Sequence, residues 1–208
     1  MSETIPQLES FLRSRLTGSL PGPQAQLRFA PEPRRKGWEP HLTPVEARQA
    51  AALILIYPGS KGLSIPLTRR PDDLPHHPGQ ISLPGGGIDA GEAPVDAALR
   101  EAWEEIGVTR EDVRIVGALS SLWVVVSGYL LYPFVGVADR WPDFQPHVRE
   151  VADIIEAPLR DLLDPAARGR HKRTMSGVPV EYAHFDVCGQ HVWGATGMVL
   201  GEFVALFD

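Results

Sequence analysis

The chain has little cysteine, no long apolar run and no excess of positive charge, and each deficit excludes a class of protein. A single cysteine, Cys188, excludes a disulfide framework and is typical of a reducing compartment. The longest purely apolar run, residues 50–57, is too short to cross a bilayer. The net charge of -6 argues against a nucleic-acid binder with a basic face. The first residues, MSETIPQLESFLRSRL, lack the apolar run of a signal peptide, so we expect a cytoplasmic protein that binds neither nucleic acid nor membrane.

Proline and glycine set the boundaries of the predicted units. The chain has 208 residues, of which 20 are proline and 20 are glycine, fewer than in low-complexity chains. This length suits one domain with a sizeable core. Apolar residues recur at helical spacing over residues 5–16, and prolines then interrupt residues 18–45. We therefore expect an N-terminal helix and an extended, Pro-rich connector over residues 1–45, followed by a folded domain over residues 46–208.

Short apolar segments and helical segments follow the connector. Strands are predicted over residues 51–57, 63–69, 113–119, 122–126, 129–137 and 151–156, with a hairpin near residues 179–193. Helices are predicted over residues 94–106, 159–163 and 196–206. Because the two types are mixed without a regular βαβ alternation, we expect an α/β (α+β) fold. The last helix is expected to pack on the domain, with a homodimer contact as the alternative.

The predicted helix over residues 94–106 has two different sides. Its apolar side has residues at positions i, i+3, i+4 and i+7, which are Leu99, Ala102, Trp103 and Ile106. The other side carries Glu101, Glu104 and Glu105. Pro94 suits the first helical turn, and Gly107 suits the left-handed residue that ends a helix. Packing through the apolar side would therefore present three carboxylates together.

Three neighbouring carboxylates near a helix end are most often a solvated acidic face, but two costs count against that interpretation here. Like charges four residues apart destabilise a helix by roughly 0.2–0.5 kcal/mol per pair. The negative C-terminal end of the helix dipole also repels them. A divalent cation reverses both effects, because Mg²⁺ binds proteins through one or two carboxylates together with waters and substrate phosphates.

Residues 86–108, GGIDAGEAPVDAALREAWEEIGV, resemble the Nudix box, G-x5-E-x7-R-E-U-x-E-E-x-G-U, in which U is an aliphatic residue. The matching positions are Gly86, Glu92, Arg100, Glu101, Ala102, Glu104, Glu105, Gly107 and Val108. The resemblance implies the Nudix fold, a mixed β-sheet sandwiched between helices (α/β/α). It also implies an activity, the hydrolysis of a nucleoside diphosphate linked to another group, in which water attacks phosphorus.

The resemblance assigns a role to the box residues. The ligands of Mg²⁺ or Mn²⁺ are three carboxylates and one backbone carbonyl, those of Glu101, Glu104, Glu105 and Gly86. An ion pair between Glu92 and Arg100 holds the loop against the helix. The catalytic candidates are Glu104, Glu105 and Arg100, and the general base is left open among Glu104, Glu105 and a later loop residue, Glu150. These residue types suit the chemistry, because hydrolysis of a pyrophosphate needs neutralised phosphate oxygens and an activated water.

A second resemblance lies upstream of the box. Nudix enzymes that cleave coenzyme A carry L-L-T-x-R-[SA]-x3-R-x3-G-x3-F-P-G-G running into the box, and residues 66–86 read PLTRRPDDLPHHPGQISLPGG. The matching positions are Leu67, Thr68, Arg70, Gly79, Pro84, Gly85 and Gly86, and the departures are Pro66, Pro71, Pro75 and Leu83. The resemblance implies a coenzyme A-like nucleotide as the small-molecule substrate. The substrate-binding candidates are Arg69, Arg70, Gly79 and Gly85.

Three functions are weighed on these grounds. The first is a metal-dependent pyrophosphohydrolase that cleaves coenzyme A or its thioesters to 3',5'-ADP and 4'-phosphopantetheine. The second is the same chemistry on ADP-ribose, NADH or dinucleoside polyphosphates, which is favoured because Pro75 replaces an arginine of the coenzyme A motif. The third is a nucleotide sensor, but such proteins usually lose box glutamates that this chain keeps. Among other residues, His76-His77 is interpreted as part of a polar loop rather than as a metal pair, and Trp193 as a core aromatic rather than an adenine-stacking residue.

Overall fold

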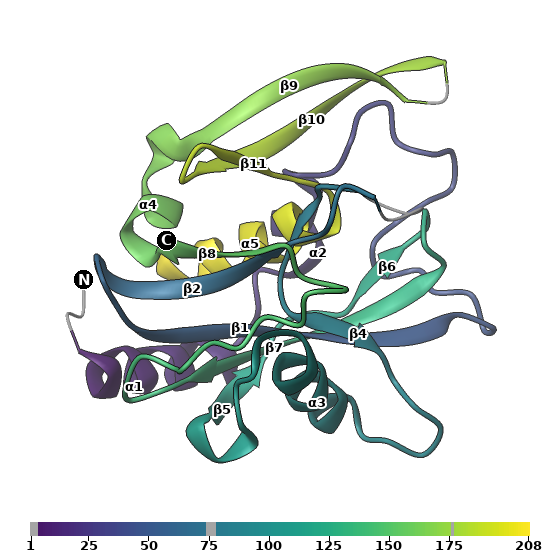
Figure 1. The fold of residues 1–208 in the computed structure, drawn as a ribbon. Helices are drawn as coiled ribbons and strands as arrows, with labels where there is room; N and C mark the ends of the chain where they lie inside the picture. The colour runs from purple at the N-terminus through teal and green to yellow at the C-terminus, as the bar shows by residue number, and fades with distance from the viewer. Residues whose placement is uncertain (1–3, 74–77, 176) are drawn as a thin grey trace.

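The computed structural model describes residues 4–73, 78–175 and 177–208 (Figure 1). Its helices are α1 (Ile5–Leu16), α2 (Gly22–Leu27), α3 (Pro94–Ile106), α4 (Leu159–Leu163) and α5 (Gly194–Val204). Its strands are β1 (Arg48–Gly59), β2 (Gly62–Arg69), β3 (Ile81–Ser82), β4 (Gly85–Gly87), β5 (Arg114–Ala118), β6 (Leu122–Val124), β7 (Tyr129–Val137), β8 (Asp153–Pro158), β9 (Arg168–Met175), β10 (Val178–Val187) and β11 (Gln190–Val192). Helices α3 and α4 and strand β7 begin and end at the predicted residues.

The main sheet is mixed, and its centre is the most apolar segment of the chain. The strand order is β3-β2-β1-β7-β5, with β4 paired to β1, β6 to β7 and β8 to β2. Strand β1 runs parallel to β7 and antiparallel to β2. Because residues 50–57 of β1 are apolar throughout, this strand suits a position that is covered on both faces.

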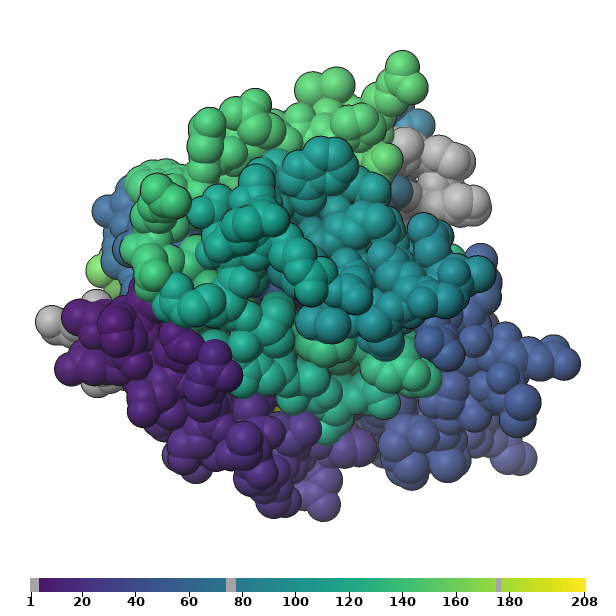
Figure 2. Space-filling model, turned by 90° about the horizontal axis from the view of Figure 1, so that it is seen from below, coloured from purple at the N-terminus to yellow at the C-terminus, as the bar shows by residue number. Residues whose placement is uncertain are grey.

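Helices cover both faces of this sheet. On one face, α3 packs through Leu99 and Ala102 against Leu53 and Leu55 of β1. On the other face, α1 and α5 pack over the alternate β1 residues, such as Ile54, in a second cluster that includes Leu8, Leu12, Val199 and Phe203. Figure 2 shows the molecule from the α3 side, with the teal α3 region in the centre and the purple N-terminal residues beside it. The predicted α/β/α arrangement is confirmed, and none of the helices in the described ranges is long and apolar enough to span a membrane.

The predicted connector is not extended throughout, because residues 22–27 form helix α2. The buried carboxylate of Glu202 on α5 accepts hydrogen bonds from the Gly22 N–H (3.1 Å) and from Gln26 Nε2 (2.7 Å). It also accepts one from the Ser120 N–H (3.1 Å), so a single acidic side chain joins three segments. The prediction failed because this helix depends on a contact 180 residues away and not on local periodicity.

Strands β9, β10 and β11 form a second, antiparallel sheet beside α5 (Figure 1). The hairpin of β10 and β11 was predicted, whereas β9 was not, because its sequence RGRHKRTM has no apolar alternation. One face of β10 points into the core, where Phe185 stacks on Phe29 with ring centroids 4.4 Å apart. The alternate residues, among them Tyr182 and His184, lie on the opposite face.

Candidate active site

Helix α3 carries the box residues, and its end is fixed as predicted. Gly107 has φ of 75°, the left-handed conformation that a glycine adopts without strain, and its N–H donates to the Trp103 carbonyl at 2.9 Å. The predicted sides of the helix need a correction, since Trp103 is 58% exposed whereas Glu105 is only 6% exposed. The buried side includes Glu105 because β4 packs beside this part of the helix.

Strand β4 consists of three glycines, and the first two allow a close approach. A Cβ atom at Gly85 would collide with the Ala51 carbonyl of β1. A Cβ atom at Gly86 would collide with the carboxylate of Glu101, whereas one at Gly87 would meet nothing within 4 Å. The backbone of Gly86 therefore lies directly against the Glu101 carboxylate.

Arg100 organises the box by binding three carboxylates. Its Nε and Nη2 donate to the two oxygens of Glu92 at 2.9 and 3.0 Å, and Nη2 also donates to the Gly87 carbonyl at 2.8 Å. Its Nη1 donates to Glu101 at 2.8 Å and to Glu104 at 3.0 Å. The hydrogen bond from Arg100 lowers the pKa of Glu92, which keeps the pair ionised. The loop between β4 and α3 is thus tied to the helix.

Glu105 is a carboxylate held in an environment that disfavours its charge. Burial, together with the nearby charges of Glu101 and Glu150, raises its pKa to about 8. Two groups lower the pKa of Glu105. They are the Gly85 N–H, which donates to Glu105 Oε2 at 3.2 Å, and the Arg70 cation. Burial also raises the pKa of Glu101. Glu101 is paired with Arg100, whereas Glu105 has no ion-pair partner among the described residues.

The donor set fits a hard divalent cation. Carboxylate and carbonyl oxygens are the ligands that Mg²⁺ and Mn²⁺ prefer, and a cation would supply a positive charge next to the buried Glu105. In this structure Arg100 binds both Glu101 and Glu104, and the three box carboxylates do not gather within 4.8 Å of one another in the described residues. The fit therefore rests on the chemistry of these residues and on the burial of Glu105.

The loop that carries Glu150 docks on the C-terminal end of α3. The His147 N–H donates to the Glu105 carbonyl, and the Gln145 N–H donates to the Ile106 carbonyl, both at 2.9 Å. The Glu150 side chain is 54% exposed, and its carboxylate lies 3.7 Å from Nδ1 of His147. Glu150, one of the three base candidates, is therefore brought into electrostatic range of Glu101 and Glu105.

The two arginines at the end of β2 have different surroundings. Arg69 pairs with Asp72 at 3.2 Å. The Nε of Arg70 is buried without a hydrogen-bond partner among the described residues, and its charge acts on Glu105. Gly79 has φ of +64° and lies against the carboxylate of Asp72, the partner of Arg69, and not against the box glutamates. Pro75 and His76-His77 lie outside the described residues.

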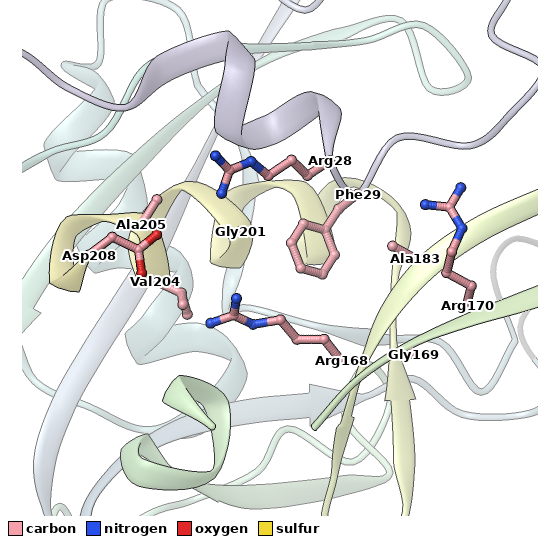
Figure 3. Close-up of a pocket in the computed structure, with 10 residues that line it drawn as sticks. All are labelled: Arg28, Phe29, Arg168, Gly169, Arg170, Ala183, Gly201, Val204, Ala205 and Asp208. Carbon is pink, nitrogen blue, oxygen red and sulfur yellow. The ribbon is translucent and has the colours of Figure 1, made fainter. Parts of the chain in front are cut away.

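A separate cavity of about 260 Å³ lies away from the box residues, between the second sheet and α5 (Figure 3). Arg28 and Arg168 extend into the same region from opposite sides, and Phe29 lies between them. None of the predicted site residues lines this cavity. The carboxylate cluster at α3 therefore stays the candidate active site.

The sequence profile of the NUDIX domain matches residues 47–176. A relative from Enterobacter, described as the uncharacterized Nudix hydrolase NudL, is 36% identical over 74% of this chain and 80% of its own length. The chain belongs to the Nudix hydrolase family. A second NudL relative, from Pectobacterium atrosepticum, is 41% identical, and the match spans 58% of this chain and 62% of that protein. The MutT protein of Methanosarcina mazei shares the Nudix fold at 18% identity, with a TM-score of 0.50 over 78% of this chain and 96% of that protein.

Sequence reasoning missed two backbone groups of the site. The Gly85 N–H holds Glu105, and the Gly87 carbonyl accepts from Arg100. The run of three glycines before the helix was a signal for such backbone contacts, because glycine permits a close approach of the main chain.

Proposed function

We propose that this Nudix hydrolase cleaves the diphosphate of coenzyme A or its thioesters, with Mg²⁺ or Mn²⁺, to give 3',5'-ADP and 4'-phosphopantetheine. The observation that carries the proposal is that the Arg70 cation acts electrostatically on the buried Glu105 carboxylate, while the buried Nε of Arg70 has no hydrogen-bond partner in the described part of the chain. A diphosphate oxygen suits this place, because arginine binds phosphate through charge-assisted hydrogen bonds. Arg70 belongs to the segment 66–86 that resembles the coenzyme A motif.

The box residues would hold the metal ion. Glu101, Glu104 and Glu105 are the ligand candidates, and Gly86 offers its carbonyl. When bound, the cation would neutralise charge on the diphosphate oxygens and lower the pKa of a water. Arg100 binds both Glu101 and Glu104, and its pairing with Glu92 fixes the loop that joins Gly86 and the rest of β4 to the helix.

In the proposed reaction the oxygen of a water molecule forms a bond to one phosphorus, and the bond from that phosphorus to the bridging oxygen breaks. The water proton passes to a carboxylate, for which Glu104, Glu105 and Glu150 are the candidates. Each product then carries one of the two phosphates of the former diphosphate. Arg70 is assigned to the phosphate oxygens that gain negative charge as the bond breaks.

The alternative substrates are ADP-ribose, NADH and dinucleoside polyphosphates. One observation favours them, namely that Pro71 and Pro75 stand where the coenzyme A motif has other residues, and Pro75 replaces an arginine. Both prolines belong to the sequence between β2 and β3, and Pro71 directly follows Arg70. The reaction would be the same, and only the group on the far side of the diphosphate would differ.

A substrate panel tests the proposal. The protein is incubated with Mg²⁺ or Mn²⁺ and coenzyme A, acetyl-coenzyme A, ADP-ribose, NADH or a dinucleoside tetraphosphate, and products are separated by chromatography. We expect the highest kcat/KM with coenzyme A or its thioester, and loss of that activity in Glu105→Gln but not in Glu111→Gln, an exposed residue outside the site. Faster turnover of another compound would refute the substrate, and no turnover of any diphosphate would refute the reaction.

A further inference from the structure

A group of metal-ligating side chains lies on the second sheet, apart from the box. Tyr182, His184 and Asp186 alternate along β10 and share one face of it. His191 of β11 is paired directly opposite Asp186, so it belongs to the same face. The chain reverses between these strands within a few residues, which brings two histidines and one carboxylate together.

Both histidines lie at ion-pair distance from Asp186, and the spacing of the three groups is close to that of ligands around one ion. Nε2 of His191 lies 3.4 Å from Asp186 Oδ1, and Nε2 of His184 lies 3.9 Å from Asp186 Oδ2. One ligand atom from each of the three residues falls within 4.8 Å of the other two. Ligands at about 2.0–2.1 Å from a tetrahedral ion are about 3.3 Å apart, so small side-chain rotations would close the site.

His184 has features that a purely structural histidine would not need. Its residue is only 5% exposed, and its Nδ1 has no hydrogen-bond partner among the described residues. Its ring lies against Gly169 of β9, where a Cβ atom would collide with it. The ring of His184 also stacks on that of His191, with centroids 4.2 Å apart and planes 22° apart. Nε2 is the nitrogen that lies 3.9 Å from Asp186, so a metal bond there would compensate for the burial of the ring, while Nδ1 would stay without a partner among the described residues.

We propose that His184, His191 and Asp186 bind one transition-metal ion of the Zn²⁺ class at a site separate from the box glutamates. Two imidazoles and a carboxylate suit Zn²⁺, whereas the oxygen ligands of the box suit Mg²⁺ or Mn²⁺. Three protein ligands leave a fourth position for water or an anionic group. Asp186 is 56% exposed and His191 45% exposed at their side chains, so this position opens to solvent.

The site adjoins the segment that leads into the catalytic region. Strand β11 is followed by Trp193 and then by Gly194. A Cβ atom at Gly194 would lie 3.6 Å from the Gln80 side chain. Gln80 precedes β3 and the glycines of β4. An ion that joins β10 to β11 would thus brace the strand beside this segment, without being a ligand of the reacting phosphates.

The test uses the full-length, untagged protein after removal of metals with a chelator. Co²⁺ replaces Zn²⁺ as a spectroscopic probe, and Zn²⁺ affinity is measured by competition with a chromogenic chelator. We expect one site per chain with tetrahedral Co²⁺ absorption bands that survive excess Mg²⁺. His191→Ala and Asp186→Asn should each weaken Zn²⁺ binding at least about 10-fold, and both side chains are exposed enough to keep the fold intact.

Two controls locate the ion. His41→Ala removes an exposed histidine elsewhere and should leave the affinity unchanged. The double variant Glu101→Gln, Glu105→Gln disables the box and should also retain the bands. The proposal is overturned if Zn²⁺ binding survives both hairpin substitutions, or if it disappears in the box variant.

Discussion

Glu105→Gln should separate the chemical role of this residue from its effect on stability. In the folded protein burial raises the Glu105 pKa to about 8, from an ordinary value of 4.5. The folded state therefore holds its proton more tightly than the unfolded state, so the metal-free protein loses stability as pH rises from about 4.5 to about 8. At pH 7 the loss from this one group is about 3 kcal/mol, at about 1.4 kcal/mol per pH unit. Glutamine has no charge to bury, and its carbonyl oxygen can still accept from the Gly85 N–H.

The assay is urea unfolding in EDTA at pH 5 and pH 7.5, together with the kcat for coenzyme A in Mg²⁺. We expect Glu105→Gln to be more stable than the wild type at pH 7.5 by a few kcal/mol and nearly equal to it at pH 5. Its kcat should fall by roughly 10²-fold or more. Glu111→Gln, an exposed control, should change neither quantity. A variant that is less stable at pH 7.5, or that keeps near-normal kcat, would refute the reasoning.

Three further substitutions test other parts of the account. Arg70→Ala should lower kcat/KM for the diphosphate substrate by about 10–100-fold with little change in Tm. Steady-state kinetics equal to those of the wild type would exclude Arg70 as a phosphate ligand. Gly86→Ala should lower the Mg²⁺-dependent rate at least about 10-fold, because its Cβ collides with the Glu101 carboxylate. Gly87→Ala, whose Cβ meets nothing, should leave the rate unchanged. Equal rates in the two variants would argue against the close approach of Gly86 to Glu101. Glu202→Ala should destabilise the protein by about 3 kcal/mol in urea unfolding, because two buried donors and one partly buried donor lose their acceptor. A change below about 1 kcal/mol would contradict that.

Local patterns predicted the elements whose stability is local. Helix α3 has the 3.6-residue spacing, a proline in its first turn and Gly107 at its end, and the structure reproduces each of these features. Strand β9 could not be predicted in this way, because its polar residues form a strand only by pairing with β10. Helix α2 likewise depends on the distant carboxylate of Glu202.

The candidate site was predictable in its residue types but not in its burial. The spacing of Glu101, Glu104 and Glu105 gave their common helix, yet the pattern placed Trp103 in the core and Glu105 at the surface. The structure reverses these two positions because the glycines of β4 pack beside the helix, and the helix sequence alone contains no information about that neighbour. The electrostatic effect of Arg70 on Glu105 likewise arises from the fold, since the two residues lie on different elements.

The hydrolysis of coenzyme A in ¹⁸O-labelled water tests the central claim most directly. The protein is incubated with coenzyme A and Mg²⁺ or Mn²⁺, and the masses of the products are measured by mass spectrometry. We predict two products, 3',5'-ADP and 4'-phosphopantetheine, one of which carries a single ¹⁸O atom in the phosphate that came from the cleaved diphosphate, because water attacks phosphorus. Intact coenzyme A after long incubation, or products that carry no label in either phosphate, would contradict the account.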